Sequence, residues 1–212
     1  MISNKWFTQE NKLNLLLGLY LSCIITANLL GSKITEIFGI RTSVAILVFP
    51  LTLLITDIVG EVLGKHRANN IVYTGLIMQI FVLAVIIISL AAPPNTTWNN
   101  QAAYESIFGV SVRIILASFA AFLLSQIHDV WSFHFWKRKT KGKYLWFRNN
   151  ASTIMSQLID TTVFMFLAFY MATPKFTADF VISLIIPYWL LKVLFAVIET
   201  PLCYLGVRWL KK

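Results

Sequence analysis

The pattern Ser-Gln-x-x-Asp occurs twice in the sequence, 31 residues apart, and it brings together side chains suited to holding a polar small molecule. The first copy contains Gln126 and Asp129, and the second contains Gln157 and Asp160. Residues three apart share a face of a helix, so each copy would present an amide and a carboxylate together. A carboxylate accepts neighbouring hydrogen bonds and an amide both donates and accepts, which suits a ligand with donors and an acceptor along one edge.

Five of the nine acidic residues lie inside long apolar stretches: Asp57, Glu61, Asp129, Asp160 and Glu199. An ionisable group near the centre of a bilayer costs at least about 2.5–3.5 kcal/mol, so it should face a bundle interior or a water-filled cavity. The helical rise puts Asp57, Asp129 and Glu199 roughly 12–14 Å from the basic end of their stretches, and Asp160 about 18 Å. These similar depths predict one polar cluster, shared by four helices, that binds a small molecule.

A purely structural interpretation applies to two sets of charges. Asp57, Glu61 and Lys65 have the i, i+4, i+8 spacing of one helix face, and Lys192 and Glu199 are seven residues apart. Intramembrane ion pairs of Asp57 with Lys65, or of Lys192 with Glu199, would fix helix packing without binding a ligand. The two Gln-x-x-Asp pairs have no nearby cation in sequence, so this alternative explains them less well.

The composition requires a membrane as the solvent for these helices. Hydrophobic residues make up 58% of the 212 positions, charged residues 13%, and the mean hydropathy is +0.72. A soluble globule of this composition would aggregate, and a nucleic-acid-binding domain would need a polar surface to carry the net charge of +9. The two cysteines lie in apolar runs without metal-ligand spacing, so we expect no disulfide framework, no metal site and no cofactor.

Six apolar stretches are long enough to cross a bilayer, which needs about 20 residues each. The sequence therefore predicts an all-α membrane protein with one domain over residues 1–212. Gly60 and Gly64, four residues apart, predict a close helix approach in the second stretch. The predicted spans are 13–32, 42–64, 71–91, 114–136, 150–171 and 180–207, and the residues between the third and fourth form an outer connection with Trp98 and Tyr104.

The distribution of lysine and arginine predicts the orientation of these spans. Thirteen of the 18 basic residues fall on one side of the six spans, four fall on the other, and Lys192 lies within a span. Because cytoplasmic loops retain basic residues, both termini are expected in the cytoplasm, which requires an even number of crossings.

Several strings resemble the queuosine precursor transporter family, also called vitamin uptake transporters, and together they extend from the first span to the last. They include Thr-Asp-x-x-Gly-Glu-x-x-Gly-Lys from Thr56, Lys192, and Glu-Thr-Pro from Glu199. The other strings are Ala27–Lys33, the Phe-Pro-Leu-Thr that begins at Phe49, Ser125–Trp131 and Lys137–Thr161.

The resemblance implies a bacterial inner-membrane importer of 7-deazaguanine bases used for tRNA queuosine salvage. The implied substrate is chiefly 7-cyano-7-deazaguanine, with its 7-aminomethyl relative as the open alternative. It also implies a six-helix fold similar to the substrate-binding subunits of energy-coupling-factor vitamin transporters. The partners expected are the small-molecule base and the lipid bilayer, with proton coupling and a homodimer left open.

Two other functional classes were weighed against a stand-alone secondary transporter. A substrate-binding subunit of an ATP-driven energy-coupling-factor-type transporter would need a partner ATPase, since the sequence has no Gly-x-x-x-x-Gly-Lys-Ser/Thr loop. An intramembrane enzyme would need a Ser/His couple, a zinc motif or an acidic magnesium motif, and the sequence has none of these, so we expect no enzymatic activity.

The predicted site residues fall into two groups. Asp160 and Gln157, with Gln126 and Asp129 opposite, are expected to recognise the base. Asn28 is assigned to the same group, with Trp131 as a ring that stacks on it. The residues expected to line the path or to serve gating and coupling are Asp57, Glu61, Lys192 and Glu199.

Overall fold

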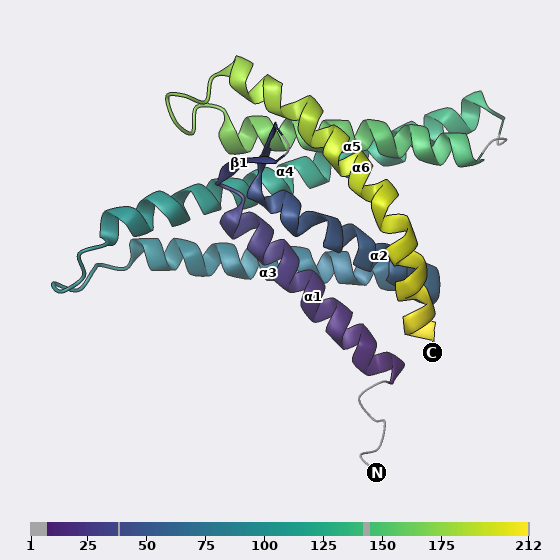
Figure 1. Cartoon of the computed structure of the whole chain (residues 1–212), viewed down its shortest axis with the longest axis horizontal. Coiled ribbons are helices and arrows are strands. Elements are labelled where there is room, and N and C mark those ends of the chain that lie inside the picture. Colours follow the sequence, from purple (N-terminus) through teal and green to yellow (C-terminus); the bar gives the residue numbers. More distant parts are fainter. Residues whose placement is uncertain (1–7, 38, 142–144, 212) are drawn as a thin grey trace, which may run out of the picture. The chain divides into compact units, whose positions relative to one another are not determined.

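A computed structural model of the chain consists of long helices and one short hairpin (Figure 1). It describes residues 8–37, 39–141 and 145–211; within helices, the side chains of 129, 130, 133, 137, 145–150, 153, 196, 197, 199 and 200 are outside the description. The elements are α1 (Gln9–Leu30), β1 (Ile34–Ile37), β2 (Ile40–Ser43), the 3-10 helix η2 (Val44–Leu47), α2 (Phe49–Leu63), α3 (Lys65–Ala91), α4 (Gln101–Lys139), α5 (Leu145–Phe169) and α6 (Ala178–Lys211).

A turn at a glycine joins α2 to α3. It separates Lys65 from Asp57 and Glu61, which the sequence had placed on one helix. Gly64 has φ 85°, a left-handed conformation that glycine adopts without a steric penalty, and α3 begins at the next residue, Lys65. Lys65 therefore does not continue the helix face of Asp57 and Glu61, and the predicted i, i+8 relation is wrong. Gly64 ends the helix instead of admitting a close neighbour, since a Cβ there would meet nothing within 4 Å.

The outer connection between α3 and α4 is shorter than predicted. Only residues 92–100 separate the two helices, because α4 begins at Gln101. Tyr104, which the sequence placed in this connection, lies in the first turns of α4, and its hydroxyl donates to the Ser89 hydroxyl on α3 at 2.9 Å. This hydrogen bond joins the two helix ends that flank the connection.

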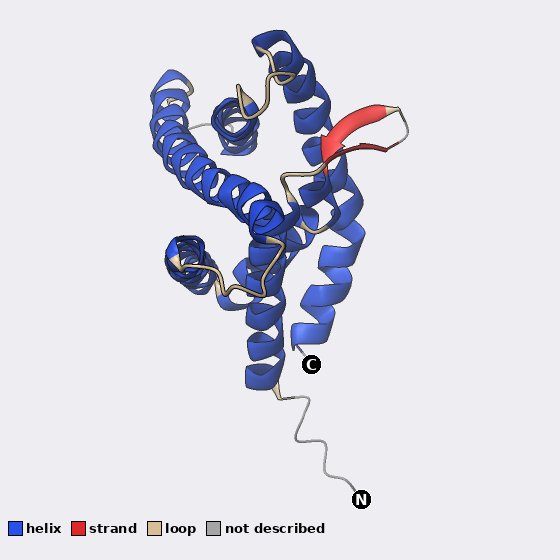
Figure 2. Ribbon diagram, turned by 90° about the vertical axis from the view of Figure 1, so that its left-hand side faces the viewer, coloured by secondary structure: helices blue, strands red, loops and turns tan. Residues whose placement is uncertain are grey.

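A two-stranded hairpin, formed by β1 and β2, follows α1 in the sequence and was not predicted (Figure 2). Gly39, between the strands, has φ 77°, as tight hairpin turns often require. The Ser43 hydroxyl at the end of β2 donates to the Gly31 carbonyl at 2.7 Å and accepts from the amide of Ala45 at 3.2 Å. Ser43 thereby binds the residue that follows α1 and caps η2.

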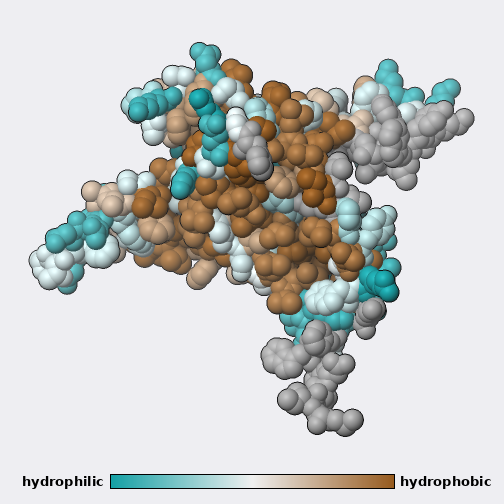
Figure 3. All heavy atoms as spheres, in the orientation of Figure 1, coloured by the Kyte–Doolittle hydropathy of each residue, from teal (hydrophilic) through white to brown (hydrophobic). Residues whose placement is uncertain are grey.

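The helices have the length and composition of membrane spans, which confirms the prediction of an all-α membrane protein. Five helical stretches among the described residues are long and apolar enough to cross a bilayer, and α5 contributes a shorter apolar stretch, Ile154–Phe169. The five are Gln9–Leu30, Val44–Leu63, Lys65–Ala91, Gln101–His128 and Ala178–Phe195. On the face shown in Figure 3, hydrophobic side chains cover the helices and hydrophilic ones gather at helix ends and connections.

The chain divides into two compact units. Unit 1 comprises Met1–Thr35, Ser43–Ser111 and Leu191–Lys212, and unit 2 comprises Glu36–Thr42 and Val112–Leu190. In unit 1, α1, α2, α3 and the end of α6 enclose a core of buried apolar side chains. These are Leu16, Tyr20, Ile55, Ile58, Val59, Ile71 and Leu210.

Two glycines allow the helices of unit 1 to approach closely, although neither is Gly60 or Gly64. A Cβ on Gly75 of α3 would lie 2.6 Å from Cε1 of Tyr20 on α1. A Cβ on Gly206 of α6 would collide with the Cδ1 atom of Ile58 on α2. Small residues at such contacts are the usual means by which membrane helices come close enough to pack.

In unit 2, buried apolar residues recur every three or four positions along α4, α5 and the first half of α6. They are Ile114, Ile115, Ala117, Ala121, Met165, Ala168, Phe169, Val181, Leu184, Ile185 and Tyr188. The Arg113 guanidinium of α4 donates to the Leu167 carbonyl at 2.7 Å and to the Tyr170 carbonyl, at the carboxyl end of α5. A cation at this position satisfies terminal carbonyls and opposes the negative end of the helix dipole.

Candidate functional site

The second Ser-Gln-x-x-Asp copy lies on α5, within unit 2, and forms the centre of the candidate site. Gln157, Asp160 and Thr161 have the i, i+3, i+4 spacing of one helix face. The Gln157 Oε1 atom and the Thr161 Oγ1 atom are buried and have no hydrogen-bond partner among the described residues. Thr161 is completely buried, at 0% exposure. This face therefore keeps hydrogen-bonding capacity that its surroundings do not use.

The first half of α6 brings two aromatic residues to the same level of unit 2. Tyr188 is 3% exposed, and its hydroxyl interacts electrostatically with the Asp160 carboxylate. The next residue, Trp189, has a buried indole Nε1 without a partner in the described structure. The site thus combines a carboxylate, an amide, two hydroxyls and an indole N–H from two helices.

The first Ser-Gln-x-x-Asp copy lies on α4, and the structure describes it only in part. Gln126 is exposed, and the side chain of Asp129 lies outside the described residues, so its role opposite Gln157 and Asp160 stays a prediction. The clearest described contact between α4 and the second copy is made by His128, whose Nδ1 lies 3.1 Å from the Ser156 hydroxyl.

Trp131, the predicted stacking residue, is 58% exposed. Its ring stacks on Phe135 with centroids 5.6 Å apart and packs at a tilt against His128 at 5.9 Å. Trp131 belongs to an aromatic row along α4, whereas Trp189 on α6 has a buried indole N–H.

A second polar location lies in unit 1, where α2, α3 and the end of α6 surround a pocket of about 920 Å³. Both Asp57 and Glu61 line it. Their carboxylates are exposed to the pocket and form no ion pair or hydrogen bond with another described residue. The other lining residues are Thr56, Gly60, Lys65, Ala68, Asn69, Val72, Cys203, Tyr204, Val207 and Lys211.

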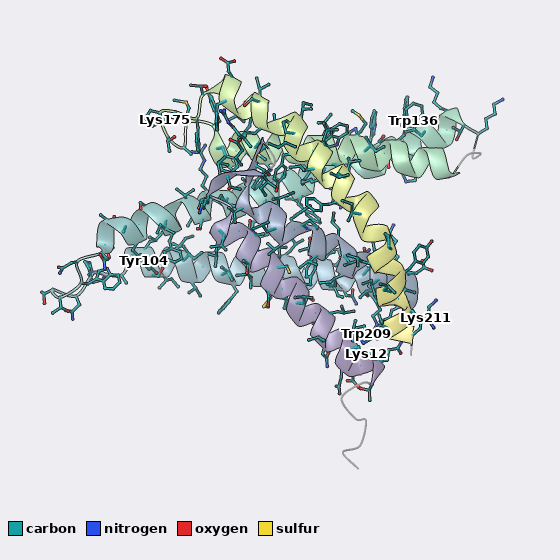
Figure 4. The ribbon with its side chains drawn as sticks, viewed as in Figure 1. Lys12, Tyr104, Trp136, Lys175, Trp209 and Lys211 are labelled. Carbon is teal, nitrogen blue, oxygen red and sulfur yellow. The ribbon has the colours of Figure 1, made fainter. Side chains whose placement is uncertain are left out.

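The α6 wall of this pocket is held by contacts on both of its sides. Gly206 packs against Ile58 on α2. The buried Lys12 of α1 donates from Nζ to the Trp209 carbonyl at 2.9 Å, and the same Nζ lies 5.3 Å from the centre of the Trp209 ring (Figure 4). These contacts join the first turn of α1 to the last turns of α6 and fix the helix that carries Tyr204 and Lys211.

The remaining predicted residues also lie in unit 1. Asn28 is 6% exposed, and its Nδ2 donates to the Ile24 carbonyl of its own helix at 3.1 Å. Lys192 is 6% exposed, with its Nζ 4.7 Å from the centre of the Phe49 ring. The Glu199 side chain lies outside the described residues, so its ion pair with Lys192 stays a prediction.

Sequence reasoning also missed Gln79, a buried polar residue of α3. It is 2% exposed, and neither Nε2 nor Oε1 of its amide has a hydrogen-bond partner within the described part of the chain. The third predicted span contains no Asp, Glu, Lys or Arg, so no charged residue on this helix points to the neutral amide. A rule that also scores Gln and Asn within apolar helices would have found it.

Comparisons with known proteins give a consistent result. Residues 43–206 match the family model described as "Putative vitamin uptake transporter". The "Probable queuosine precursor transporter" of Bacillus subtilis (strain 168) is 31% identical over 181 residues, which cover 85% of this chain and 78% of that protein. The "Queuosine precursor transporter" of Escherichia coli (strain K12) is 28% identical over 192 residues, covering 90% of this chain and 84% of that protein.

A relative from Haemophilus influenzae, also named "Probable queuosine precursor transporter", is 27% identical over 73% of this chain and 63% of its own length. No solved structure matches the chain. The family model covers most of the chain, including the pocket residues up to Tyr204 and both Ser-Gln-x-x-Asp copies. The chain is a multi-pass membrane protein and belongs to the family of vitamin uptake transporters that includes the queuosine precursor transporters.

Proposed function

We propose that this protein imports a queuosine precursor, a 7-deazaguanine base, into the bacterial cytoplasm across the inner membrane. The names of its relatives support the substrate class. The observation that carries the proposal is the α5 face of unit 2, where the buried Gln157 Oε1 lacks a partner one turn from Asp160. A buried polar atom without a partner is accounted for when a ligand supplies the missing hydrogen bond.

The chemistry of a guanine-like base fits this face. Such a base presents a ring N–H beside an exocyclic amine, and one carboxylate can accept from both, which is the role proposed for Asp160. Gln157 adds an amide that can both accept from the base and donate to its carbonyl. A base that lacks the paired donors would not form these two hydrogen bonds with the Asp160 carboxylate and would therefore bind weakly. The 7-cyano base is the expected substrate, and the 7-aminomethyl base is the second candidate.

The pocket of unit 1 is proposed as the part of the pathway that couples transport to protons. Asp57 and Glu61 expose two carboxylates to one space of about 920 Å³, with Lys65 and Lys211 on the same lining. Carboxylates that a neighbouring cation does not neutralise are suited to exchange protons as water enters and leaves. Lys192 and Glu199 are proposed to assist gating, and Asn28, Gln126, Asp129 and Trp131 are retained as substrate-binding residues.

The proposed topology has six crossings, with α5 as the sixth span and both termini in the cytoplasm. The thirteen basic residues on one side of the predicted spans support this orientation. In this topology the pocket of unit 1 opens near the cytoplasmic ends of α2 and α6. The protein is proposed to work as a stand-alone secondary transporter with a fold like that of energy-coupling-factor substrate-binding subunits.

The test is uptake of radiolabelled 7-cyano-7-deazaguanine by liposomes that contain only this chain and no ATP. We expect saturable uptake that Asp160→Asn lowers at least tenfold. The substitution replaces one carboxylate oxygen, which accepts a hydrogen bond from the ligand, by an NH2 group, which faces the ligand's donor with another donor. Asp179→Asn, at an exposed position in the first turn of α6, is the matched control and should transport normally.

Three outcomes would contradict parts of this proposal. Normal affinity in Asp160→Asn would remove that residue from the site, and uptake only after addition of an ATPase partner would remove the stand-alone mechanism. A rate that does not change with an imposed pH gradient would remove proton coupling and, with it, the role of Asp57 and Glu61.

A further inference from the structure

Three polar atoms on α5 and α6 within unit 2 are buried without a hydrogen-bond partner among the described residues. They are Gln157 Oε1, Thr161 Oγ1 and Trp189 Nε1. The neighbouring Thr162 shows the usual behaviour of a helical threonine, because its hydroxyl donates to the Leu158 carbonyl at 2.8 Å. Thr161 lies next to it, fully buried, and makes no such bond.

The register of α5 and α6 brings these atoms to one level of unit 2. The two helices are consecutive, and the ring of Phe169, the last residue of α5, lies 6.0 Å from that of Phe176 in the connection to α6. Asp160 lies nine residues before the end of α5, and Tyr188 lies ten residues after the start of α6. Two antiparallel neighbours therefore place them opposite each other, in agreement with the electrostatic interaction between Asp160 and Tyr188. Thr161 and Trp189 are the next residues along each helix.

We propose that Thr161 and Trp189 contact the transported base together with Gln157 and Asp160. This inference rests on the proposed import function and adds two residues that set specificity. The indole N–H of Trp189 only donates, so it requires an acceptor on the ligand. Gln157 Oε1 and the Asp160 carboxylate require donors, and the Thr161 hydroxyl serves either purpose. The matching ligand is a neutral, flat heteroaromatic with donors and acceptors around its rim.

If these side chains had a purely structural role, their replacement should lower the stability of the free protein; if they bind the ligand, it should not. A hydroxyl that stabilises the fold has a partner, and its removal lowers the melting temperature. A buried hydroxyl without a partner destabilises the free protein, and replacing it by a group of the same shape is neutral or stabilising. Loss of binding without loss of stability therefore distinguishes a ligand contact from a packing contact.

The experiment uses the full chain in nanodiscs, with 7-cyano-7-deazaguanine as the probe in isothermal titration calorimetry. The variants are Thr161→Val, which keeps the shape of the side chain, and Trp189→Phe, which removes the N–H. The controls are Thr162→Val, next to Thr161 on the same helix, and Trp98→Phe, at an exposed position in the α3–α4 connection. We expect each test variant to raise the Kd about tenfold and each control to change it less than twofold.

The melting temperature without ligand is measured for the same proteins. Thr161→Val should melt at or above the wild-type temperature. Wild-type Kd in both test variants would overturn the inference while the proposed function stands. A weaker Kd together with a lower ligand-free melting temperature in Thr161→Val would assign a structural role and also overturn it. Absence of binding by the wild type would instead refute the proposed function, and this inference with it.

Discussion

At the scale of single residues, Gln79 is a buried polar side chain to which neither proposed site assigns a role. Its amide is 2% exposed on α3 and has no hydrogen-bond partner in the part of the chain that the structure describes. Gly75, one turn earlier on the same face, packs against Tyr20, so Gln79 lies on the side of α3 that faces α1. The amide therefore carries a desolvation cost inside the bundle.

Replacing Gln79 by methionine should stabilise the protein. The side chains have similar volume and helix propensity, and the change removes a buried amide whose missing hydrogen bonds cost about 1–3 kcal/mol. We expect a rise in the free energy of unfolding of that order, measured by denaturant unfolding in detergent. Thr74→Val is the control, since the Thr74 hydroxyl already donates to the Asn70 carbonyl at 2.7 Å. A less stable Gln79→Met variant would contradict the assignment of an unpartnered amide.

Residue types and spacing were enough to find the polar face of α5. Gln157 and Asp160 stand out because burying a carboxylate in an apolar helix costs free energy and the amide precedes it by three residues, on the same helix face. Thr161 and Gln79 could not be chosen in this way. A threonine or glutamine is tolerated in many helices, and only the contacts of its neighbours decide whether its polar atoms have partners.

At the scale of helices, the contact of α6 with α2 determines the wall of the unit 1 pocket. Gly206 lies against Ile58, and Lys12 binds the Trp209 carbonyl three residues further along α6. The neighbouring α6 residues Tyr204, Val207 and Lys211 line the pocket of unit 1. A change in this packing should therefore alter both stability and the pocket.

Gly206→Ala should destabilise the protein, because the added Cβ would collide with Ile58 Cδ1 and lie 2.8 Å from Ile58 Cγ1. Overpacking of this kind costs typically about 1–3 kcal/mol. Ile58→Val in the same protein removes the colliding methyl group and should recover part of the loss, which a double-mutant cycle measures as a coupling energy. Gly109→Ala, where a Cβ would meet nothing within 4 Å, is the control. Additive effects of Gly206→Ala and Ile58→Val would rule out this contact.

The helices themselves were predictable, because apolar runs of about 20 residues have no other stable form in a bilayer. The errors lie at their ends. α3 begins at Lys65 because Gly64 turns the chain in one residue, and α4 begins at Gln101 with Tyr104 bonded to Ser89. The strands β1 and β2 have four residues each, which is too short for an alternation of apolar and polar residues to be recognised between two apolar spans.

At the scale of the whole molecule, the proposed orientation gives a direct labelling prediction. The α3–α4 connection should face the outside and the α4–α5 connection the cytoplasm, since basic residues gather in the latter. In a background with Cys23→Ala and Cys203→Ala, a membrane-impermeant maleimide should label Thr97→Cys in intact cells. It should label Arg138→Cys only after the cells are opened. Labelling of Arg138→Cys in intact cells would reverse the proposed orientation.

The sequence alone determined the solvent, the helices and the chemistry of this protein. Its apolar runs require a membrane, and the acids and amides within them are too costly to keep without a polar interior. Only the tertiary structure decided which polar atoms have partners, where Asp57 and Glu61 meet a pocket, and how α6 is held against α2. These properties depend on contacts between residues far apart in the chain, and local spacing carries no information about them.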